Sequence, residues 1–263
     1  EAIQAIYGFQ IDLNTSFTGE DSLDISLDAG SNAATLGILD TNAGSTSADA
    51  LTVDGISYTF PLGDKITLFV GDSVDGSSLY NTACVYGGVT INLDDCGNGS
   101  SAMASSIDDK TAAGASYDFG NGFTAALGYE GQGAGDSKGL MTKEGNDIYG
   151  GQLTYTADSF GVSLTYAKND SGEDSSYKAI NAYYAPESAD AFPSISAGYE
   201  IGSLQDLDTT KGEDTEQWMV GLQWDEVGAG TLGIAAGTDG AIGEDSTDYY
   251  VYEAFYSYPM NDG

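Results

Sequence analysis

Regular alternation of apolar and polar residues constrains this chain more than any other feature, and it is clearest in residues 113–130. Apolar side chains take every second position on both sides of the triplet Gly120-Asn121-Gly122. Successive side chains of a β-strand point to opposite faces, so this stretch predicts a hairpin with one apolar face and one small, polar or acidic face. Asn121-Gly122 is typical of a tight hairpin turn.

The same alternation recurs along the chain and predicts thirteen strands. They cover residues 7–17, 23–29, 51–60, 65–72, 113–119, 123–130, 149–157, 160–167, 177–185, 194–200, 216–225, 231–237 and 248–258. We expect short turns to alternate strictly with long acidic loops. Outer-membrane barrels have this pattern, and a Greek-key sandwich has no reason to keep it. The predicted fold class is all-β, an antiparallel transmembrane β-barrel with about 13 strands in this chain.

The chain is strongly acidic, with 41 Asp and Glu against 7 Lys, no Arg and no His, for a net charge of -34. Clustered Lys or Arg is needed to bind phosphate backbones, so this composition excludes nucleic acid as a partner. No stretch of about 18 apolar residues predicts a transmembrane helix. A cation-attracting channel and a halophilic soluble protein share this charge, so charge alone does not separate them.

Carboxylates recur on the polar faces of the predicted strands, where a packed soluble core would have to pair them. At mid-depth a charge facing lipid costs about 2–4 kcal/mol, so we expect Asp12 to face water. A lumen lined by negative charges alone would favour cations over anions. Four of these carboxylates lie near strand ends, where the alternative is a solvated rim: Glu130, Asp158, Glu200 and Asp225. The predicted pore-lining residues are Asp12, Asp24, Asp28, Asp118, Glu130, Asp158, Glu200, Asp225 and Glu253.

Residues 73–110 form the longest segment without clear periodicity. A loop of this length in a compact domain is usually functional, and we expect it to fold into the pore as a constriction loop. A disulfide between Cys84 and Cys96 would pin it and would indicate an oxidising compartment. The alternatives are an exterior loop and two free thiols. The charged residues of this candidate loop are Asp94, Asp95, Asp108, Asp109 and Lys110.

Four stretches also resemble a known family: LNTSFTGEDSL (13–23), PSISAGYE (193–200), WMVGLQW (218–224) and YEAFYSYPMNDG (252–263). They are similar to the major porins of cyanobacterial outer membranes, which are related to the OprB-type carbohydrate-selective porins. The resemblance implies a barrel of about 16 strands, commonly trimeric, for passive passage of small hydrophilic solutes and inorganic ions. It also implies a lipid bilayer with lipopolysaccharide as the surroundings.

Two features of that family are missing from the sequence: an N-terminal surface-layer-homology domain and a final strand that ends in an aromatic residue. We therefore expect residues 1–263 to be a barrel domain that is incomplete at both ends. Sugar selectivity in such pores often involves Arg. This chain has none, which argues against that specificity.

No catalytic set emerges, because without His there is no Ser-His-Asp or Cys-His arrangement. We expect no cofactor. The acidic loops lack EF-hand spacing, so we expect at most weak Ca²⁺ binding by them. The competing function is a soluble or surface-attached acidic β-rich adhesion or structural protein. Release by salt or chelator without detergent would favour that alternative over the porin.

Overall fold

The computed structural model describes residues 8–30, 51–90, 92–93, 96–97, 110–132, 139–142, 145–171, 173–186, 192–205, 212–243 and 250–259. In these ranges fourteen strands form one antiparallel sheet, which confirms the all-β prediction. No helix in the described ranges is long and apolar enough to cross a membrane. The strands are β1 (Gly8–Thr15), β2 (Ser22–Gly30), β3 (Thr52–Leu62), β4 (Ile66–Asp72), β5 (Thr111–Gly120), β6 (Phe123–Gly131), β7 (Asp147–Thr156), β8 (Phe160–Ser171), β9 (Glu173–Tyr184), β10 (Ser194–Gln205), β11 (Gly212–Val227), β12 (Gly230–Thr238), β13 (Ile242–Gly243) and β14 (Tyr250–Ser257).

Apart from β13, the strands pair in sequence order, from β1 to β12 and then β14. The thirteen predicted strands are all present, and the additional strand is the two-residue β13, which pairs with β11. Two residues are too few to show alternation, so β13 was not predicted. No ladder between β1 and β14 occurs among the described residues.

The predicted turn between β5 and β6 is confirmed. Gly120 pairs with Phe123, so Asn121 and Gly122 alone form the loop. Both have positive φ, 53° and 84°, as a type I′ turn requires. A β-carbon on Gly122 would lie 2.1 Å from the carbonyl oxygen of Thr156, so this position needs glycine for space as well as for conformation.

The expected strict alternation of short turns and long loops is wrong at two places. One residue separates β8 from β9, and six separate β10 from β11, fewer than the nine between β9 and β10. A long connection was expected over residues 168–176, but the two strands stay paired up to Ser171 and Glu173. This part of the hairpin extends beyond the apolar stretch of the two strands, and its residues are almost all polar. Apolar alternation therefore gave no sign of it.

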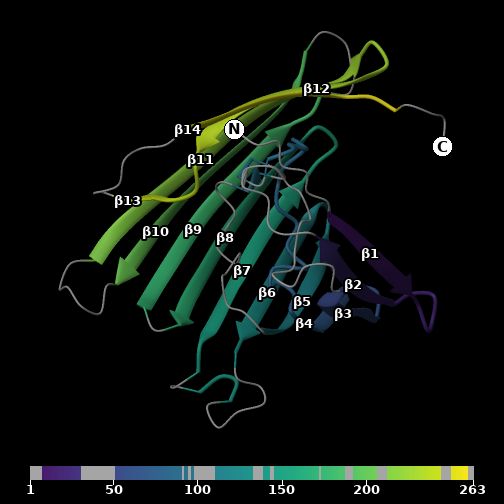
Figure 1. Cartoon of the computed structure of the whole chain (residues 1–263), viewed down its shortest axis with the longest axis vertical. Coiled ribbons are helices and arrows are strands. Elements are labelled where there is room, and N and C mark those ends of the chain that lie inside the picture. The colour runs from purple at the N-terminus through teal and green to yellow at the C-terminus, as the bar shows by residue number, and fades with distance from the viewer. Residues whose placement is uncertain are drawn as a thin grey trace.

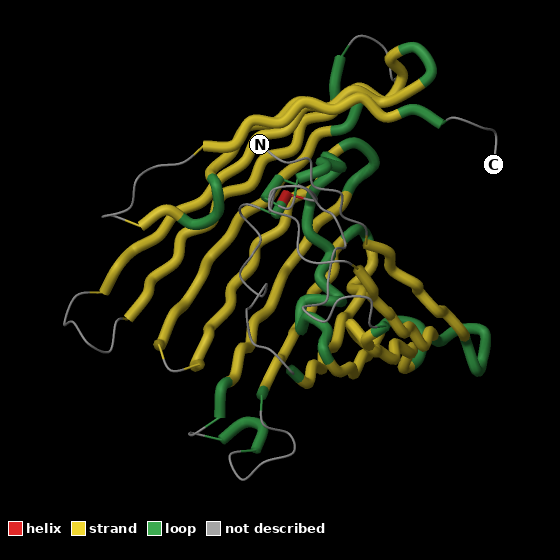
Figure 2. Tube along the Cα trace, viewed as in Figure 1, coloured by secondary structure: helices red, strands yellow, loops and turns green. Residues whose placement is uncertain are grey.

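The sheet is strongly curved, and residues 73–90 cross its concave side (Figures 1 and 2). We call the concave side the inner face. Its buried polar side chains include Glu130, Gln152, Thr154, Ser163, Thr165, Asn181, Ser196, Glu200, Gln217 and Glu253.

The opposite, outer face carries exposed apolar and aromatic side chains. Leu127 is 68% exposed, whereas Glu130, three residues later on the same strand, is completely buried. Soluble domains bury their apolar side chains and expose their charges, so this sheet is arranged in the reverse sense. Other exposed residues of the outer face are Leu153, Leu164, Ile180, Tyr199, Ile201, Val220, Ile234, Tyr252 and Tyr256.

Candidate functional site

The inner segment, residues 73–90, runs across the strands on the inner face of the sheet. It forms hydrogen bonds with one strand after another. From Gly76 to Val89 it meets β6, β7, β8, β10, β11 and β14 in that order. The contacts are Gly76 N to Glu130 Oε1 (2.7 Å), Thr154 Oγ1 to the Asn81 carbonyl (2.8 Å), Gln152 Nε2 to Thr82 Oγ1 (3.0 Å), Ala83 N to Ser163 Oγ (3.0 Å), Val85 N and Tyr86 N to Ser196 Oγ (3.0 and 3.1 Å), Gly87 N to Gln223 Oε1 (3.1 Å), and Val89 N to Glu253 Oε2 (3.0 Å).

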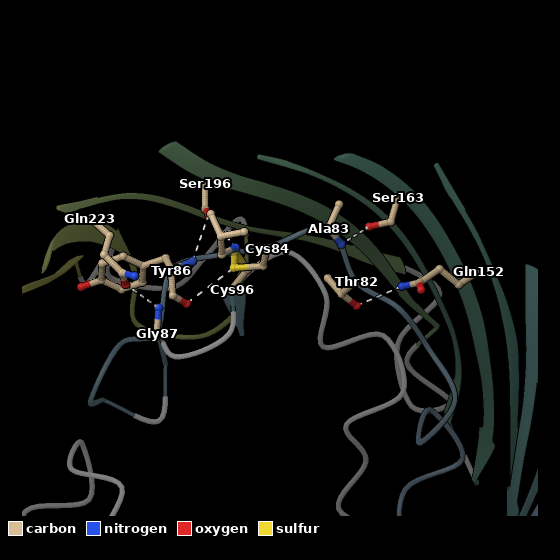
Figure 3. Close-up of a disulfide and its surroundings, with 11 residues drawn as sticks. Thr82, Ala83, Cys84, Tyr86, Gly87, Cys96, Gln152, Ser163, Ser196 and Gln223 are labelled. Carbon is tan, nitrogen blue, oxygen red and sulfur yellow. Dashed lines mark hydrogen bonds between the residues drawn. A yellow bond between two sulfur atoms is a disulfide. The ribbon is translucent and has the colours of Figure 1, made fainter. Parts of the chain in front are cut away.

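The spacing of these contacts is that of an extended backbone. The amides of Ala83, Val85, Gly87 and Val89 all donate to the wall, and they are every second residue. In an extended chain alternate N–H groups point to the same side. The segment therefore lies along the wall with one edge fixed to it, as Figure 3 shows around Ala83 and Tyr86.

One end of the segment is held by charge. The ammonium of Lys110 forms ion pairs with Asp75 and, at 3.6 Å, with Glu130. Lys110 and Glu130 are both buried, and Asp75 is half exposed. The backbone also closes here, because Ser73 N donates to the carbonyl of Lys110 at 2.7 Å. Lys110, predicted as a charge of the loop, thus has its charge balanced by two carboxylates.

The other end of the segment is held by Glu253 on β14. The hydroxyl of Tyr86 donates to Glu253 Oε1 at 2.5 Å, and the amide of Val89 donates to Oε2. Burial, followed by this hydrogen bond, raises the pKa of the Tyr86 phenol far above its usual value. Tyr86 therefore stays a hydrogen-bond donor to Glu253 throughout the physiological pH range.

The expected disulfide between Cys84 and Cys96 is present, with 6.0 Å between the Cα atoms (Figure 3). Among the described residues it belongs to the larger of two small apolar clusters, in which Tyr86, Leu93, Cys96, Met219 and Ala235 are buried. The ring of Tyr86 lies on Gly221, where a β-carbon would be 2.6 Å from the ring. Apolar packing therefore fixes the segment against β11 and β12 in addition to the hydrogen bonds.

The acidic residues of β1 and β2 lie on one face of that hairpin and form a polar network. Ser26 Oγ donates to Asp12 at 2.7 Å, and Asn14 Nδ2 donates to Asp24 at 2.5 Å. Residues that pair in register share a face of the sheet. One such row of pairs runs from this hairpin to the inner face across β1 to β6: Asn14, Asp24, Ser57, Gly71, Ala112 and Glu130. Asp28 follows Asp24 on the same face of β2 by alternation.

The remaining predicted carboxylates fall into three settings. Asp118 on β5 is exposed and pairs in register with Thr124, in the same row as Thr154 and Ser163 of the inner face. Glu200 on β10 is buried and accepts a hydrogen bond from Gln217 at 2.5 Å. Asp225, exposed near the end of β11, accepts one from Gln223 at 2.7 Å.

Asp158 lies in the exposed turn between β7 and β8, not on a strand. Its place corresponds to the rim alternative. The loop charges Asp94, Asp95, Asp108 and Asp109 lie outside the described residues, as do most of the acidic loops expected to bind Ca²⁺ weakly. In the parts of the chain that the structure describes, no cluster of three or more acidic or Cys side chains is placed to hold a metal ion.

The hydroxyl and amide side chains that bind the inner segment were not singled out from the sequence. Ser163, Ser196 and Gln223 are ordinary polar residues at inward positions of their strands. The signal available was their place in the alternation, which gives the face but not the partner.

One acidic residue of the β1–β2 turn is buried and accepts hydrogen bonds from its own turn and from β3. Asp21 accepts hydrogen bonds from the Thr18 hydroxyl and amide, from Ser16 Oγ, from the Phe17 amide and from the Tyr58 hydroxyl. The Thr18 hydroxyl contributes most to lowering the pKa of the Asp21 carboxyl well below its usual range. This turn lies within the LNTSFTGEDSL stretch and connects the antiparallel strands β1 and β2.

The chain is similar in structure to outer-membrane β-barrel proteins. OmpT of Vibrio cholerae, in-vitro folded and in its trimer form, matches 95% of this chain and 91% of its own chain, with a TM-score of 0.52 and 12% identity. A porin matches 94% and 92% with 16% identity, but its TM-score is 0.45. The shared fold rests on the first match, because a TM-score below 0.5 does not establish one. No family model and no curated sequence matches the chain, so the resemblance to cyanobacterial porins stays a prediction.

Proposed function

We propose that this chain forms the wall of a passive, water-filled pore in an outer membrane, for small hydrophilic solutes and inorganic ions, with a preference for cations. The observation that carries the proposal is the reversed sheet, with exposed apolar residues such as Leu127 on one face and buried polar residues such as Glu130 on the other. An apolar outer face is stable in lipid, and a polar inner face is stable beside water.

The inner segment supports a channel of limited width. It is fixed to the wall from Glu130 on β6 to Glu253 on β14, so it occupies space on the concave side. We propose that it is the constriction loop predicted for residues 73–110. Its backbone rigidity would then set the size limit for solutes.

The charge of the chain supports cation preference. Lys110, on the inner side, is neutralised by Asp75 and Glu130, whereas Asp12, Asp24 and Asp118 lie on the polar face of their strands. Carboxylates lining a narrow aqueous path attract counter-ions and repel anions. We propose that Asp28, Glu200, Asp225 and Glu253 add to this field, and Asp158 at the rim.

We also propose a homotrimer of the cyanobacterial OprB-like type in a bilayer that contains lipopolysaccharide. The four sequence stretches named above support the family, and the OmpT neighbour was observed as a trimer. The proposed role involves no catalysis and no cofactor.

Planar-bilayer recording tests the function. The purified protein should give stepwise increases in conductance, and a potassium chloride gradient should give a reversal potential of the sign that cation flow produces. An anion-selective reversal potential would contradict the charge assignment. Extraction by salt or chelator without detergent would instead favour the soluble adhesion or structural protein.

A further inference from the structure

A polar pocket of about 310 Å³ lies on the inner face, between Leu79 and Asn81 of the inner segment and the strands β4 to β7, which run side by side in Figure 1. The hydrogen bonds between the inner segment and the strands begin at Glu130 on β6 and end at Glu253 on β14. In the described ranges these bonds leave β1 to β5 uncovered. The pocket is therefore at the boundary between the wall that the segment occupies and the wall that stays open.

The register shows that the pocket belongs to the inner face. Its polar lining lies on two neighbouring rows of paired residues, and residues of one row share a face of the sheet. Both rows end at residues that bind the inner segment, since Gln152 donates to Thr82 and Thr154 donates to the Asn81 carbonyl. The rows are Thr67, Ser116, Ala126 and Gln152, and then Asp118, Thr124 and Thr154.

Several polar atoms of the pocket are available to a ligand. Within the part of the chain that the structure describes, the hydroxyls of Thr67, Ser116 and Thr124 have no hydrogen-bond partner. Asp118 Oδ1 accepts a hydrogen bond from the Gly120 amide at 2.7 Å, which holds the carboxylate in place, and Oδ2 accepts none from a described residue. The pocket thus offers one carboxylate and three hydroxyl oxygens with free lone pairs.

Lys65 also borders the pocket, but its ammonium is directed to the other side of the sheet. It lies 6.0 Å from the centre of the Tyr117 ring, and Tyr117 is exposed on the outer face, between the inward residues Ser116 and Asp118. The described residues contain no ion pair of Lys65 with Asp64 or Asp118. Because Asp64 and Lys65 are neighbours of opposite charge, the net charge of the pocket is that of Asp118.

The pocket is larger than a bare inorganic ion requires. At about 30 Å³ per water molecule it has room for about ten waters. Leu79 and Ala126 add apolar surface beside the polar rows. A carboxylate next to apolar surface fits a solute with a cationic end and a short hydrocarbon part. An ammonium group has three N–H donors and no acceptor, so it complements a carboxylate surrounded by hydroxyl oxygens.

We infer that this pocket binds small primary amines in their ammonium form as they pass the inner segment. The ammonium lies at Asp118, the hydroxyls of Thr67, Ser116 and Thr124 accept its remaining hydrogen bonds, and the hydrocarbon part packs against Leu79. Asp118 is then a specificity-determining residue and not only one of many negative charges. The inference rests on the proposed pore function and names a class of organic solute for it.

A ligand-observed NMR titration of the complete protein in detergent tests the inference. The probes are propylammonium, which has three N–H donors, and tetramethylammonium, which has the same charge and no donor. The variants are D118N, T67V/S116A and, as a matched control, E216Q, since Glu216 pairs in register with Ile201 of the outer face.

The wild type and E216Q should bind propylammonium more tightly than tetramethylammonium. D118N should weaken propylammonium binding about fivefold, the upper range for an exposed ion pair. T67V/S116A should remove most of the preference for propylammonium over tetramethylammonium, because the hydroxyls recognise the N–H groups and not the charge.

Three results would overturn the inference: equal binding of propylammonium by D118N and the wild type, equal binding of the two organic cations by the wild type, or equal affinity for propylammonium and potassium. Heat-dependent migration in gels shows that each variant is folded, and T67V/S116A tests the pocket independently of D118N. Conductance is measured on the same preparations. A wild type that binds propylammonium but conducts no ions contradicts only the pore proposal, whereas one that conducts without discriminating between these cations contradicts only the inference.

Discussion

The hydroxyl of Tyr86 donates a 2.5 Å hydrogen bond to Oε1 of Glu253, which lies 167 residues later in the chain. This bond joins the inner segment to the last described strand, while Gly76 and Glu130 join the same segment to β6. The segment therefore ties together strands that are far apart in the sheet. Its contribution to stability should be measurable as well as its effect on conductance.

We predict that Y86F destabilises the protein by about 1–3 kcal/mol, because the buried Glu253 loses a donor that water cannot replace. Urea unfolding in detergent, followed by tryptophan fluorescence, measures the difference. Y252F is the matched control: Tyr252 lies on the neighbouring position of β14, but it is 79% exposed on the outer face. Equal effects of Y86F and Y252F would show that the bond to Glu253 contributes nothing.

We predict that the Cys84–Cys96 disulfide resists reduction in the folded protein, because Cys96 is completely buried in an apolar cluster. Thiol labelling after treatment with dithiothreitol should be slow in the native state and fast after heat unfolding. C84S/C96S should lower stability by about 3 kcal/mol, the value expected for closing a loop of this length. Rapid labelling of native protein would mean that the inner segment leaves the wall readily.

Local alternation was sufficient to predict the strands and the faces of the sheet. The hairpin of residues 113–130 is the clearest case, since its two strands and its two-residue turn agree with the structure. The alternation reports which residues share a face, and an antiparallel meander needs little more. It failed at β13, which is too short, and at the tip of β8 and β9, where both faces are polar.

The contacts of the inner segment were beyond sequence reasoning. Its binding to Ser163 and Ser196 joins residues 80 and more than 100 positions apart. Nothing in a single serine on a strand specifies a distant backbone amide as its partner. The presence of a functional loop could be predicted from its length and its cysteines, whereas its path along the wall required the structure.

We predict that K110M destabilises the protein by about 3 kcal/mol, because it leaves the buried Glu130 without its cation. The partly exposed Asp75 should contribute less to this loss. K110M/E130Q should recover part of it, since no unpaired buried charge then remains. Urea unfolding compares the two variants. If the destabilisation of the double variant equals the sum of the effects of K110M and E130Q measured separately, the two residues do not interact.

We predict a pH-dependent contribution from Asp21. Its pKa is lower in the folded state than the ordinary value of 3.8, so its carboxylate stabilises the β1–β2 turn above that value. The contribution is lost as the pH falls toward the folded pKa. At neutral pH, D21N should reduce amide protection at Phe17 and Thr18, and the difference from wild type should shrink below about pH 4. D158N, in an exposed turn, is the control and should change neither amide.

The last prediction concerns the acidic network of β1 and β2. If the polar face of this hairpin borders the aqueous path, D12N/D24N/D28N should lower the cation-to-anion permeability ratio, because three fixed negative charges are removed. The change should be larger at low ionic strength, where screening is weaker. Reversal potentials in potassium chloride gradients measure it. The matched control is D214N/E216Q, which removes two carboxylates from the outer face. An equal change in both variants would show that selectivity responds to net charge and not to the inner face.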